Sequence, residues 1–170
     1  MGKRDQQRQH TGWRRRLSAF LALLAVIAAT PLAAACTDGS VDLRGGWGQA
    51  RFTVELADDP AERSRGLMFR ETLPASHGML FVYDHPQHAV FWMKNTLIPL
   101  DMLFIDPQGR VRRIHENAIP HDTTQIDGGP GVLAVLEING GLSRRLGITE
   151  GSVLRHPAFG PDAAWPCDAP

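Results

Sequence analysis

The sequence predicts an α+β domain rich in β-strand, with a strongly bent mixed sheet or a partly closed barrel and two short helices. Three observations predict this class. Short apolar runs of strand length recur between turn signals, helical patterns are confined to two short segments, and the chain has no internal repeat. A chain of 170 residues with 43% hydrophobic residues can form the core of one such domain, but not of two large ones.

The first predicted strand begins near Ala50 and carries an apolar residue at every second position. These positions are Phe52, Val54 and Leu56. A helix start follows at Asp59, because an Asp side chain can cap free backbone N–H groups and Pro60 fits the first helical turn. We expect this helix to be short and to end at or near Gly66.

The remaining elements follow from apolar runs and turn chemistry. They are strands at residues 78–83, 88–96, 101–105, 110–115, 132–138 and near 152–156, and a short helix at 142–146. The tetrad 106–109 (DPQG) predicts a tight hairpin, because Pro fixes φ at the second position and Gly is unrestricted at the fourth. Residues 116–130 are expected to form a long loop.

Residues 1–35 have the pattern of a secretory signal. Three arginines at 14–16 precede an apolar run at 17–29, and small residues follow at 33–35. The apolar run of about 13 residues is shorter than the roughly 20 that a membrane-spanning helix needs. We therefore expect a protein that works outside the cytoplasm, in the periplasm or lipid-anchored to a bacterial membrane.

The charge of the remaining chain argues against one class of partner. Residues 36–170 carry 12 basic and 17 acidic side chains, a net charge of −5. Proteins that bind nucleic acid without base contacts rely on an excess of Lys and Arg, which this segment lacks. We expect no nucleic-acid partner.

The two cysteines allow two interpretations. Cys36 directly follows small residues, which resembles a bacterial lipoprotein processing site, although Ala33 stands where such sites usually have Leu. A lipid at Cys36 would be the only membrane contact. Alternatively, Cys36 and Cys167 form a disulfide in an oxidising compartment. The sequence leaves both open.

Composition divides the rest of the chain into three parts. Residues 36–49 are Gly-rich and aperiodic, and are expected to form a flexible tether. Residues 50–157 are expected to form the folded domain. Residues 158–170 are Pro-rich and are expected to form a loose tail.

The stretch 91–101 (FWMKNTLIPLD) places polar residues between two predicted strands. A buried and unpaired carboxylate is costly, so Asp101 should be hydrogen-bonded or solvated. In one interpretation, Asn95, Thr96 and Asp101 latch a difficult turn by bonding to its backbone. In the other, they join Lys94 on the polar rim of a pocket with Trp92 as its wall.

Residues 52–156 resemble the bacterial and archaeal family called domain of unknown function 192. The matching segments are residues 65–70 (RGLMFR), 78–81 (GMLF), 91–101, 135–137 (VLE) with Gly140 or Gly141, and 147–148 (GI) with Gly151. The resemblance implies a small β-rich domain that is frequently exported. It implies no agreed biochemical activity.

The leading functional hypothesis is a non-catalytic binding module for a small molecule or a protein segment. Its candidate site residues are Arg70, Trp92, Lys94, Asn95, Thr96, Asp101 and Glu137. We assign no catalytic residue and no cofactor.

Two alternatives belong to other classes. Asp101 and Glu137 could be the two carboxylates of an acid/base hydrolase, although no nucleophile elbow or phosphate-binding loop accompanies them. Metal handling is the second alternative, because thioether and imidazole groups suit copper and imidazole suits zinc. Its residues would be Met68, Met79, Met93 and Met102 with His77, His85 and His88. Methionines within apolar runs more often fill a core, so no metal ligand is assigned.

Overall fold

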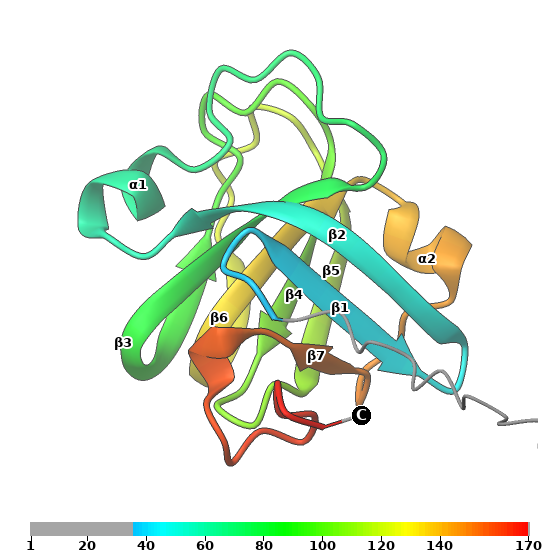
Figure 1. The fold of residues 1–170 in the computed structure, drawn as a ribbon. Helices are drawn as coiled ribbons and strands as arrows, with labels where there is room; N and C mark the ends of the chain where they lie inside the picture. The colour runs from blue at the N-terminus through cyan, green and yellow to red at the C-terminus, as the bar shows by residue number, and fades with distance from the viewer. Residues whose placement is uncertain (1–35, 170) are drawn as a thin grey trace, which may run out of the picture. The chain divides into compact units, whose positions relative to one another are not determined.

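The computed structural model describes residues 36–169, and the predicted secretory signal lies outside them. The fold is a single seven-stranded sheet with the strand order β5-β4-β6-β3-β2-β1-β7 (Figure 1). The strands are β1 (Ser40–Gly45), β2 (Gly48–Ala57), β3 (His77–Phe91), β4 (Leu100–Ile105), β5 (Val111–Ala118), β6 (Ile126–Asn139) and β7 (Val153–Arg155). The helices are α1 (Pro60–Arg65) and α2 (Leu142–Leu146). Within the described residues, no helix is long and apolar enough to cross a membrane.

The sheet is mixed and strongly curled. β2 and β3 run parallel, whereas the other neighbouring strands are antiparallel. The two edge strands approach at one end, where Val111 N donates to Ser152 O at 2.8 Å and Leu154 N donates to Gly109 O at 2.7 Å. These bonds partly close the sheet into a half-barrel, which confirms the predicted fold class.

Local signals correctly placed both helices and one hairpin. Asp59 caps α1 and accepts from Ala61 N at 2.7 Å and from Glu62 N at 2.8 Å. The tetrad 106–109 joins β4 to β5 as predicted, and its glycine has φ +74°. The cap of α1 and the turn at 106–109 involve residues close together in the sequence, so their signals could be interpreted without a distant partner.

Two apolar cores lie on opposite faces of the sheet. The side chains of β6 alternate between them: Leu136 and Ile138 face the first core, and Val135 faces the second. The first core also contains Val41, Leu43, Phe52, Val54 and Leu154, which line the inside of the half-barrel. The second core packs under the loops and contains Leu67, Met79, Met93 and Phe104.

β3 bends sharply in its middle and thereby builds the second core. Its pairing with β6 shifts register between Val82 and Gln87, and Figure 1 shows the strand turning back at this point. The returning half, which ends at Phe91, pairs with the start of β6 at Ile126. The structure thus has one bent strand where the sequence predicted two, and residues 92–96 lie beyond it rather than within a strand.

The predicted tether at 36–49 is wrong. Ser40–Gly45 form β1, which pairs with β2 on one side and with β7 on the other. Val41 and Leu43 are fully buried in the first core. The Gly-rich composition conceals these two inward-facing apolar residues, and one of the two partner strands of β1, β7, lies more than a hundred residues away.

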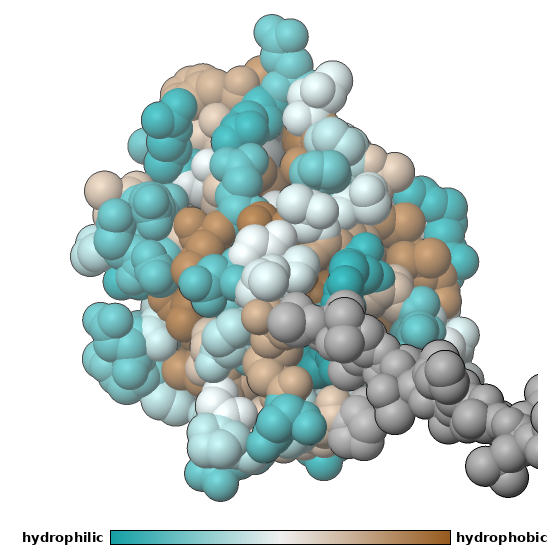
Figure 2. Space-filling model, viewed as in Figure 1, coloured by the Kyte–Doolittle hydropathy of each residue, from teal (hydrophilic) through white to brown (hydrophobic). Residues whose placement is uncertain are grey.

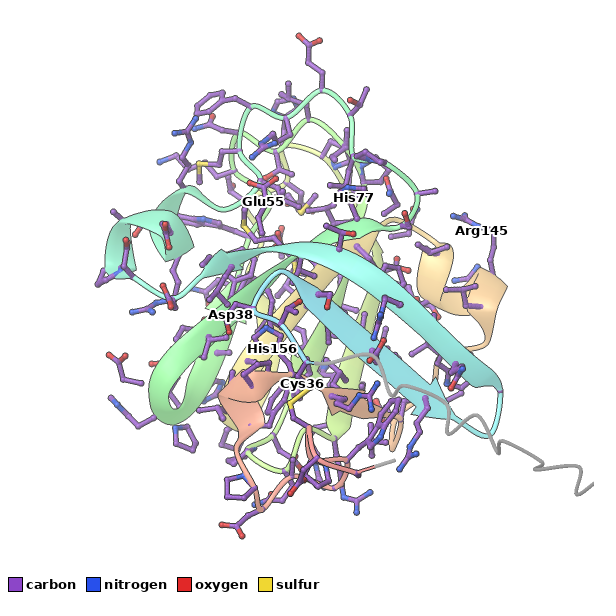
Figure 3. The ribbon with its side chains drawn as sticks, in the orientation of Figure 1. Cys36, Asp38, Glu55, His77, Arg145 and His156 are labelled. Atoms are coloured by element: carbon purple, nitrogen blue, oxygen red, sulfur yellow. A yellow bond between two sulfur atoms is a disulfide. The ribbon has the colours of Figure 1, made fainter. Side chains whose placement is uncertain are left out.

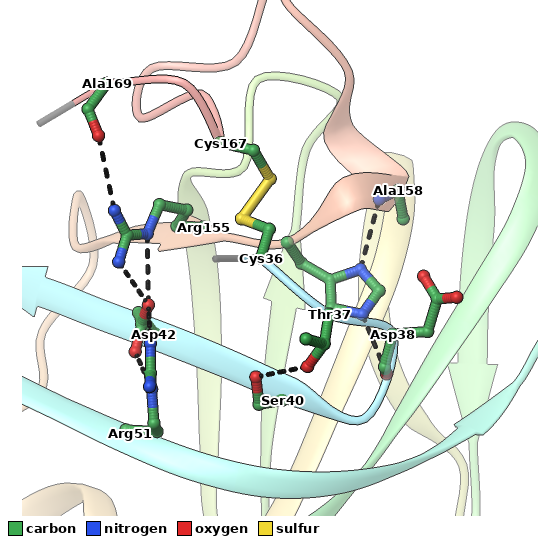
Figure 4. Close-up of a disulfide and its surroundings, with 11 residues drawn as sticks. Cys36, Thr37, Asp38, Ser40, Asp42, Arg51, Arg155, Ala158, Cys167 and Ala169 are labelled. Atoms are coloured by element: carbon green, nitrogen blue, oxygen red, sulfur yellow. Dashed lines mark hydrogen bonds and ion pairs between the residues drawn. A yellow bond between two sulfur atoms is a disulfide. The ribbon is translucent and has the colours of Figure 1, made fainter. Parts of the chain in front are cut away.

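The predicted loose tail is also wrong, because the chain after β7 is fastened to the domain. A disulfide joins Cys36 and Cys167, whose Cα atoms lie 5.6 Å apart (Figure 4). Trp165 is buried, and the guanidinium groups of Arg44 and Arg155 lie 4.1 and 4.5 Å from the centre of its ring. The tail therefore packs on β1 and β7.

The predicted loop at 116–130 is shorter in the structure. β5 extends to Ala118 and β6 begins at Ile126, so only residues 119–125 connect them. Gly128 lies within β6, where a Cβ atom would overlap the ring of Phe104. A glycine that reads as a loop signal here permits close packing instead.

Candidate binding pocket above Glu137

A cavity of about 200 Å³ opens between α1, the returning half of β3 and the second face of the sheet. The end of α1 and the segment after it form one side, through residues 63–68. Val90, Phe91 and Trp92 form the opposite side, and Phe81, Tyr83 and Glu137 come from the sheet. The bend of β3 makes this space, because it brings two halves of one strand face to face.

Glu137 is the only carboxylate among the residues that line this pocket, and it is buried. It lies on β6 directly opposite Met79 of β3 and Met102 of β4, so apolar thioethers flank it on both sides. No hydrogen bond or ion pair holds its carboxyl group within the described chain. Burial raises the pKa of Glu137 to about 8, because the charged form is poorly solvated there.

Aromatic rings form much of the pocket wall. Phe81 and Phe91 meet edge to face with ring centres 5.2 Å apart, and Phe91 meets Phe104 in the same way at 5.9 Å. Burial raises the pKa of Tyr83, so its hydroxyl stays protonated at neutral pH. Trp92 is 50% exposed and stands at the mouth. The pocket therefore combines one buried acid with aromatic faces.

Two arginines of α1 flank the pocket on one side. The guanidinium of Arg63 donates to Val82 O at 2.9 Å and also to Asp58 O, and it lies 5.5 Å from the centre of the Tyr83 ring. Arg65 is exposed and has no ion pair or hydrogen bond to its side chain within residues 36–169. Arg63 is thus held in place, whereas Arg65 is free to contact a ligand.

The segment after α1 is locked to the loop after β3 by unusual backbone geometry. Phe69 and Asn95 both have positive φ, +63° and +56°, and Phe69 N donates to Asn95 O at 2.8 Å. A positive φ is rare for a bulky residue such as Phe and costs about 1–3 kcal/mol. Phe69 is also 64% exposed, so an apolar ring is held in a strained conformation beside the pocket. Figure 2 shows apolar surface among the loops at the top of the view.

Asp101 has a different role from Glu137. Its carboxylate is fully buried and accepts from the backbone N–H groups of Asn117, Gly141 and Ser143, each at 2.7 Å. The Ser143 hydroxyl donates a fourth bond at 2.5 Å. The N-cap residue of α2 is Gly141, which has no side chain to cap the helix. Asp101 reaches across from β4 and supplies the missing acceptor.

The proposed acid/base pair of Asp101 and Glu137 does not form. Asp101 pairs with Ile138 and Glu137 pairs with Met102 on the same two strands, so successive residues place the two carboxylates on opposite faces of the sheet. Both oxygens of Asp101 are already occupied by these four hydrogen bonds. Asp101 and Glu137 therefore cannot act together as the two carboxylates of the predicted hydrolase.

The other predicted site residues are divided between the pocket and its surroundings. Trp92 and Thr96 line the pocket with Glu137, and Asn95 contacts Met68 at its edge, with 4.0 Å between Nδ2 and Sδ. The Lys94 ammonium lies 5.4 Å from the centre of the Trp92 ring.

Arg70 lies apart from the pocket. It pairs with Glu55 at 2.5 Å, and Figure 3 shows Glu55 on β2 facing the upper loops. Both side chains of this pair are exposed, so it contributes at most about 1 kcal/mol.

The methionine and histidine residues do not gather into one ligand set. Met79, Met93 and Met102 are buried in the second core, whereas His85 and His88 are exposed. His88 pairs with Asp127 at 2.7 Å. Within residues 36–169, no three His, Cys, Asp or Glu side chains lie close enough to hold a metal ion.

Several pocket residues were not predicted from the sequence. Arg63, Arg65, Phe81 and Tyr83 are unremarkable in their own segments, and only the fold brings them together. The sequence contained one signal for the pocket wall beside α1, a glycine at the end of the helix. Gly66 stands at the helix end with φ +49°, where a Cβ would approach the Phe81 ring within 3.1 Å.

Fold and pocket together define a small half-barrel domain with a ligand-sized hollow on its second face. Residues 42–156 match the model of the DUF192 family, described as an uncharacterized ACR, and the chain belongs to this family. The resemblance inferred from the sequence is thereby confirmed. The comparison with curated proteins found no match.

Two solved structures share the fold at substantial sequence identity. A protein of unknown function from Novosphingobium aromaticivorans is 46% identical with a TM-score of 0.67; the match covers 68% of this chain and 82% of that one. A "putative transcription regulator" from Sinorhizobium meliloti is 45% identical with a TM-score of 0.66; the match covers 71% of this chain and 94% of that one.

Proposed function

We propose that this domain is an exported, non-catalytic binding module, and that a small ligand or a partner segment enters the pocket above Glu137. One observation carries the proposal. Glu137 is a buried carboxyl group without a partner in the described chain, and it opens into a cavity lined by aromatic rings and by polar side chains of α1. A cavity that combines aromatic walls with a few polar groups is the usual form of a small-molecule site.

The energetics of Glu137 support a role outside folding. A buried polar group without a hydrogen bond costs about 1–3 kcal/mol relative to a satisfied one. A leucine or methionine between Met79 and Met102 would continue the core without this cost. A strongly perturbed carboxyl group in a cleft is typical of functional sites.

The composition of the pocket favours binding over catalysis. Its titratable lining groups in the described chain are Glu137, Tyr83 and the two arginines of α1. Ser64, the nearest hydroxyl on α1, donates to Pro60 O at 2.7 Å rather than to a base. A lone carboxyl group has neither a second acid nor a nucleophile with which to share a reaction.

The proposed export rests on the cysteines and the signal pattern. Disulfides persist in oxidising compartments, and Cys36 is joined to Cys167. A lipid thioether would need the same Cys36 sulfur, so a chain with this disulfide carries no lipid there. We therefore favour the periplasm over a lipid anchor. Intact mass before and after reduction tests this, because a lipidated chain would be heavier by the mass of its acyl groups.

A fragment screen with isotope-labelled protein tests the binding site. We expect bound fragments to shift the resonances of Trp92 and its neighbours. Val90→Trp should abolish this, because Val90 is an exposed residue at the pocket and the larger ring would fill the mouth. Leu97→Trp is the matched control, since Leu97 is exposed but does not line the pocket. Fragments that bind both variants equally would overturn the proposal.

A further inference from the structure

The pocket surrounds its one acid with aromatic rings, and this combination has a chemical preference. Phe81, Tyr83, Phe91 and Trp92 all line the cavity that Glu137 faces. Ring faces carry partial negative charge and attract cations, above all ammonium groups with apolar substituents. A buried carboxyl group without a partner supplies the matching counter-ion.

We propose that the group bound in this pocket is an organic ammonium ion, with Glu137 as its counter-ion and the four aromatic rings as its walls. This inference rests on the proposed function and specifies the class of ligand. The cavity of about 200 Å³ is smaller than the roughly 300–1,000 Å³ of pockets for drug-sized ligands. It therefore fits a small ion or the end of a longer chain.

Two pocket rings already attract cations of the protein itself. Arg63 lies 5.5 Å from the centre of the Tyr83 ring, and Lys94 lies 5.4 Å from that of Trp92. Both distances are within the range of about 6 Å over which a cation and a ring attract. The protein's own cations thus already lie over these two rings in the described chain, so a ligand cation must share or replace these contacts.

The groups around Glu137 determine how binding responds to pH. β3 presents Tyr83, whose pKa is raised by burial, and α1 presents the guanidinium groups of Arg63 and Arg65. The residues opposite Glu137 on β3 and β4 are Met79 and Met102, which carry no charge. The loop after β3 presents Trp92 and Thr96, and it also carries the Lys94 ammonium over the Trp92 ring. Among the described lining residues, Glu137 is the group whose pKa burial brings near neutral pH.

A cation requires Glu137 to ionise, so binding should release a proton. With a pKa of about 8, the group is ionised in roughly one tenth of molecules at about pH 7 and in roughly nine tenths at about pH 9. Affinity for an ammonium ion should therefore rise about tenfold over this interval. A neutral ligand that accepts a hydrogen bond from protonated Glu137 would show the opposite trend.

Arg63 and Arg65 add a second requirement for the ligand. Their charge opposes a cation, but both lie on the α1 side, and Arg63 is held by the carbonyl groups of Asp58 and Val82. Arg65 has no partner in the described chain and lies beside the pocket. An acidic group elsewhere on the same ligand could pair with it.

The test compares choline with its uncharged isostere 3,3-dimethylbutan-1-ol, by calorimetry on the purified chain with its disulfide intact. We expect choline to bind at least about tenfold more tightly than the alcohol at about pH 9, and to lose about tenfold in affinity at about pH 7. Glu137→Gln should remove both the preference and its dependence on pH. Trp92→Leu, at an exposed position, should weaken choline more than the alcohol.

The outcomes separate this inference from the proposed function. Equal affinity for the two probes without a pH dependence would overturn the ammonium inference and leave the binding module intact. If neither choline nor the alcohol bound, the ammonium inference would also be overturned. The fragment screen with Val90→Trp would then decide the proposed function independently.

Discussion

Asp101→Asn should destabilise the domain strongly, because the carboxylate organises three separate segments. Its Oδ1 accepts from the N–H groups of Asn117 and Gly141, and its Oδ2 accepts from the N–H and hydroxyl of Ser143. An asparagine retains one acceptor oxygen and replaces the other with an NH₂ group. If the oxygen keeps its two bonds, the NH₂ group faces two donors.

The magnitude follows from these four bonds. Leaving the buried N–H of Ser143 without an acceptor costs about 1–3 kcal/mol. The two remaining bonds lose the strength that a charged acceptor gives them, about 1 kcal/mol each. We therefore expect a loss of roughly 3–5 kcal/mol in the free energy of unfolding.

Urea unfolding of the purified domain at neutral pH measures this loss. Asp162→Asn is the matched control, because Asp162 is exposed and has no hydrogen bond to its side chain in the described chain. Its effect should stay within about 0.5 kcal/mol. A loss below about 1 kcal/mol for Asp101→Asn would refute this structural role of Asp101, since four bonds to a buried carboxylate cannot be worth so little.

The remaining predictions concern Glu137, Gly66 and the disulfide. Burial raises the pKa of Glu137 from 4.5 to about 8, so the folded chain holds a proton that the unfolded chain has lost between these values. The free energy of unfolding should then fall by about 1.4 kcal/mol per pH unit as the pH rises through this window. Glu137→Gln should remove that slope in urea titrations at about pH 5 and about pH 8, and parallel curves for the two proteins would contradict it. Gly66→Ala should cost about 1–3 kcal/mol, because φ is +49° there and the added Cβ would approach Phe81 within 3.1 Å; an unchanged melting temperature would show that the α1 end is not constrained. Replacing both Cys36 and Cys167 with Ser should cost about 2–5 kcal/mol in urea unfolding, since the bridge closes a loop with a sequence separation of 131; equal midpoints would mean that the tail is held by Trp165 alone.

Local chemistry made part of the fold predictable from the sequence. The cap at Asp59 and the hairpin at 106–109 depend on residues within one turn of each other, and both appear as predicted. β1 was missed because glycines lie at both of its ends, and because its second partner, β7, is more than a hundred residues away in the sequence. Such a strand is fixed by the strands of the sheet with which it pairs.

The pocket was predictable only in part, for a related reason. Glu137, Trp92 and Thr96 were identified from their segments, and all three line the cavity. The sequence could not reveal that Asp101 and Glu137 face opposite ways, because this depends on the register between β4 and β6. The bend of β3 that creates the cavity is likewise a property of two paired strands together.

The disulfide turns the described domain into a closed ring of chain. Cys36 and Cys167 have Cα atoms 5.6 Å apart, a gap that about two or three residues of extended peptide can span. A covalent peptide link there, with new ends opened at the exposed Gly46, would place β1 after β7 in the chain. Those strands are already antiparallel neighbours, so the permuted order would make one edge of the half-barrel contiguous and leave the pocket, on the other face, untouched.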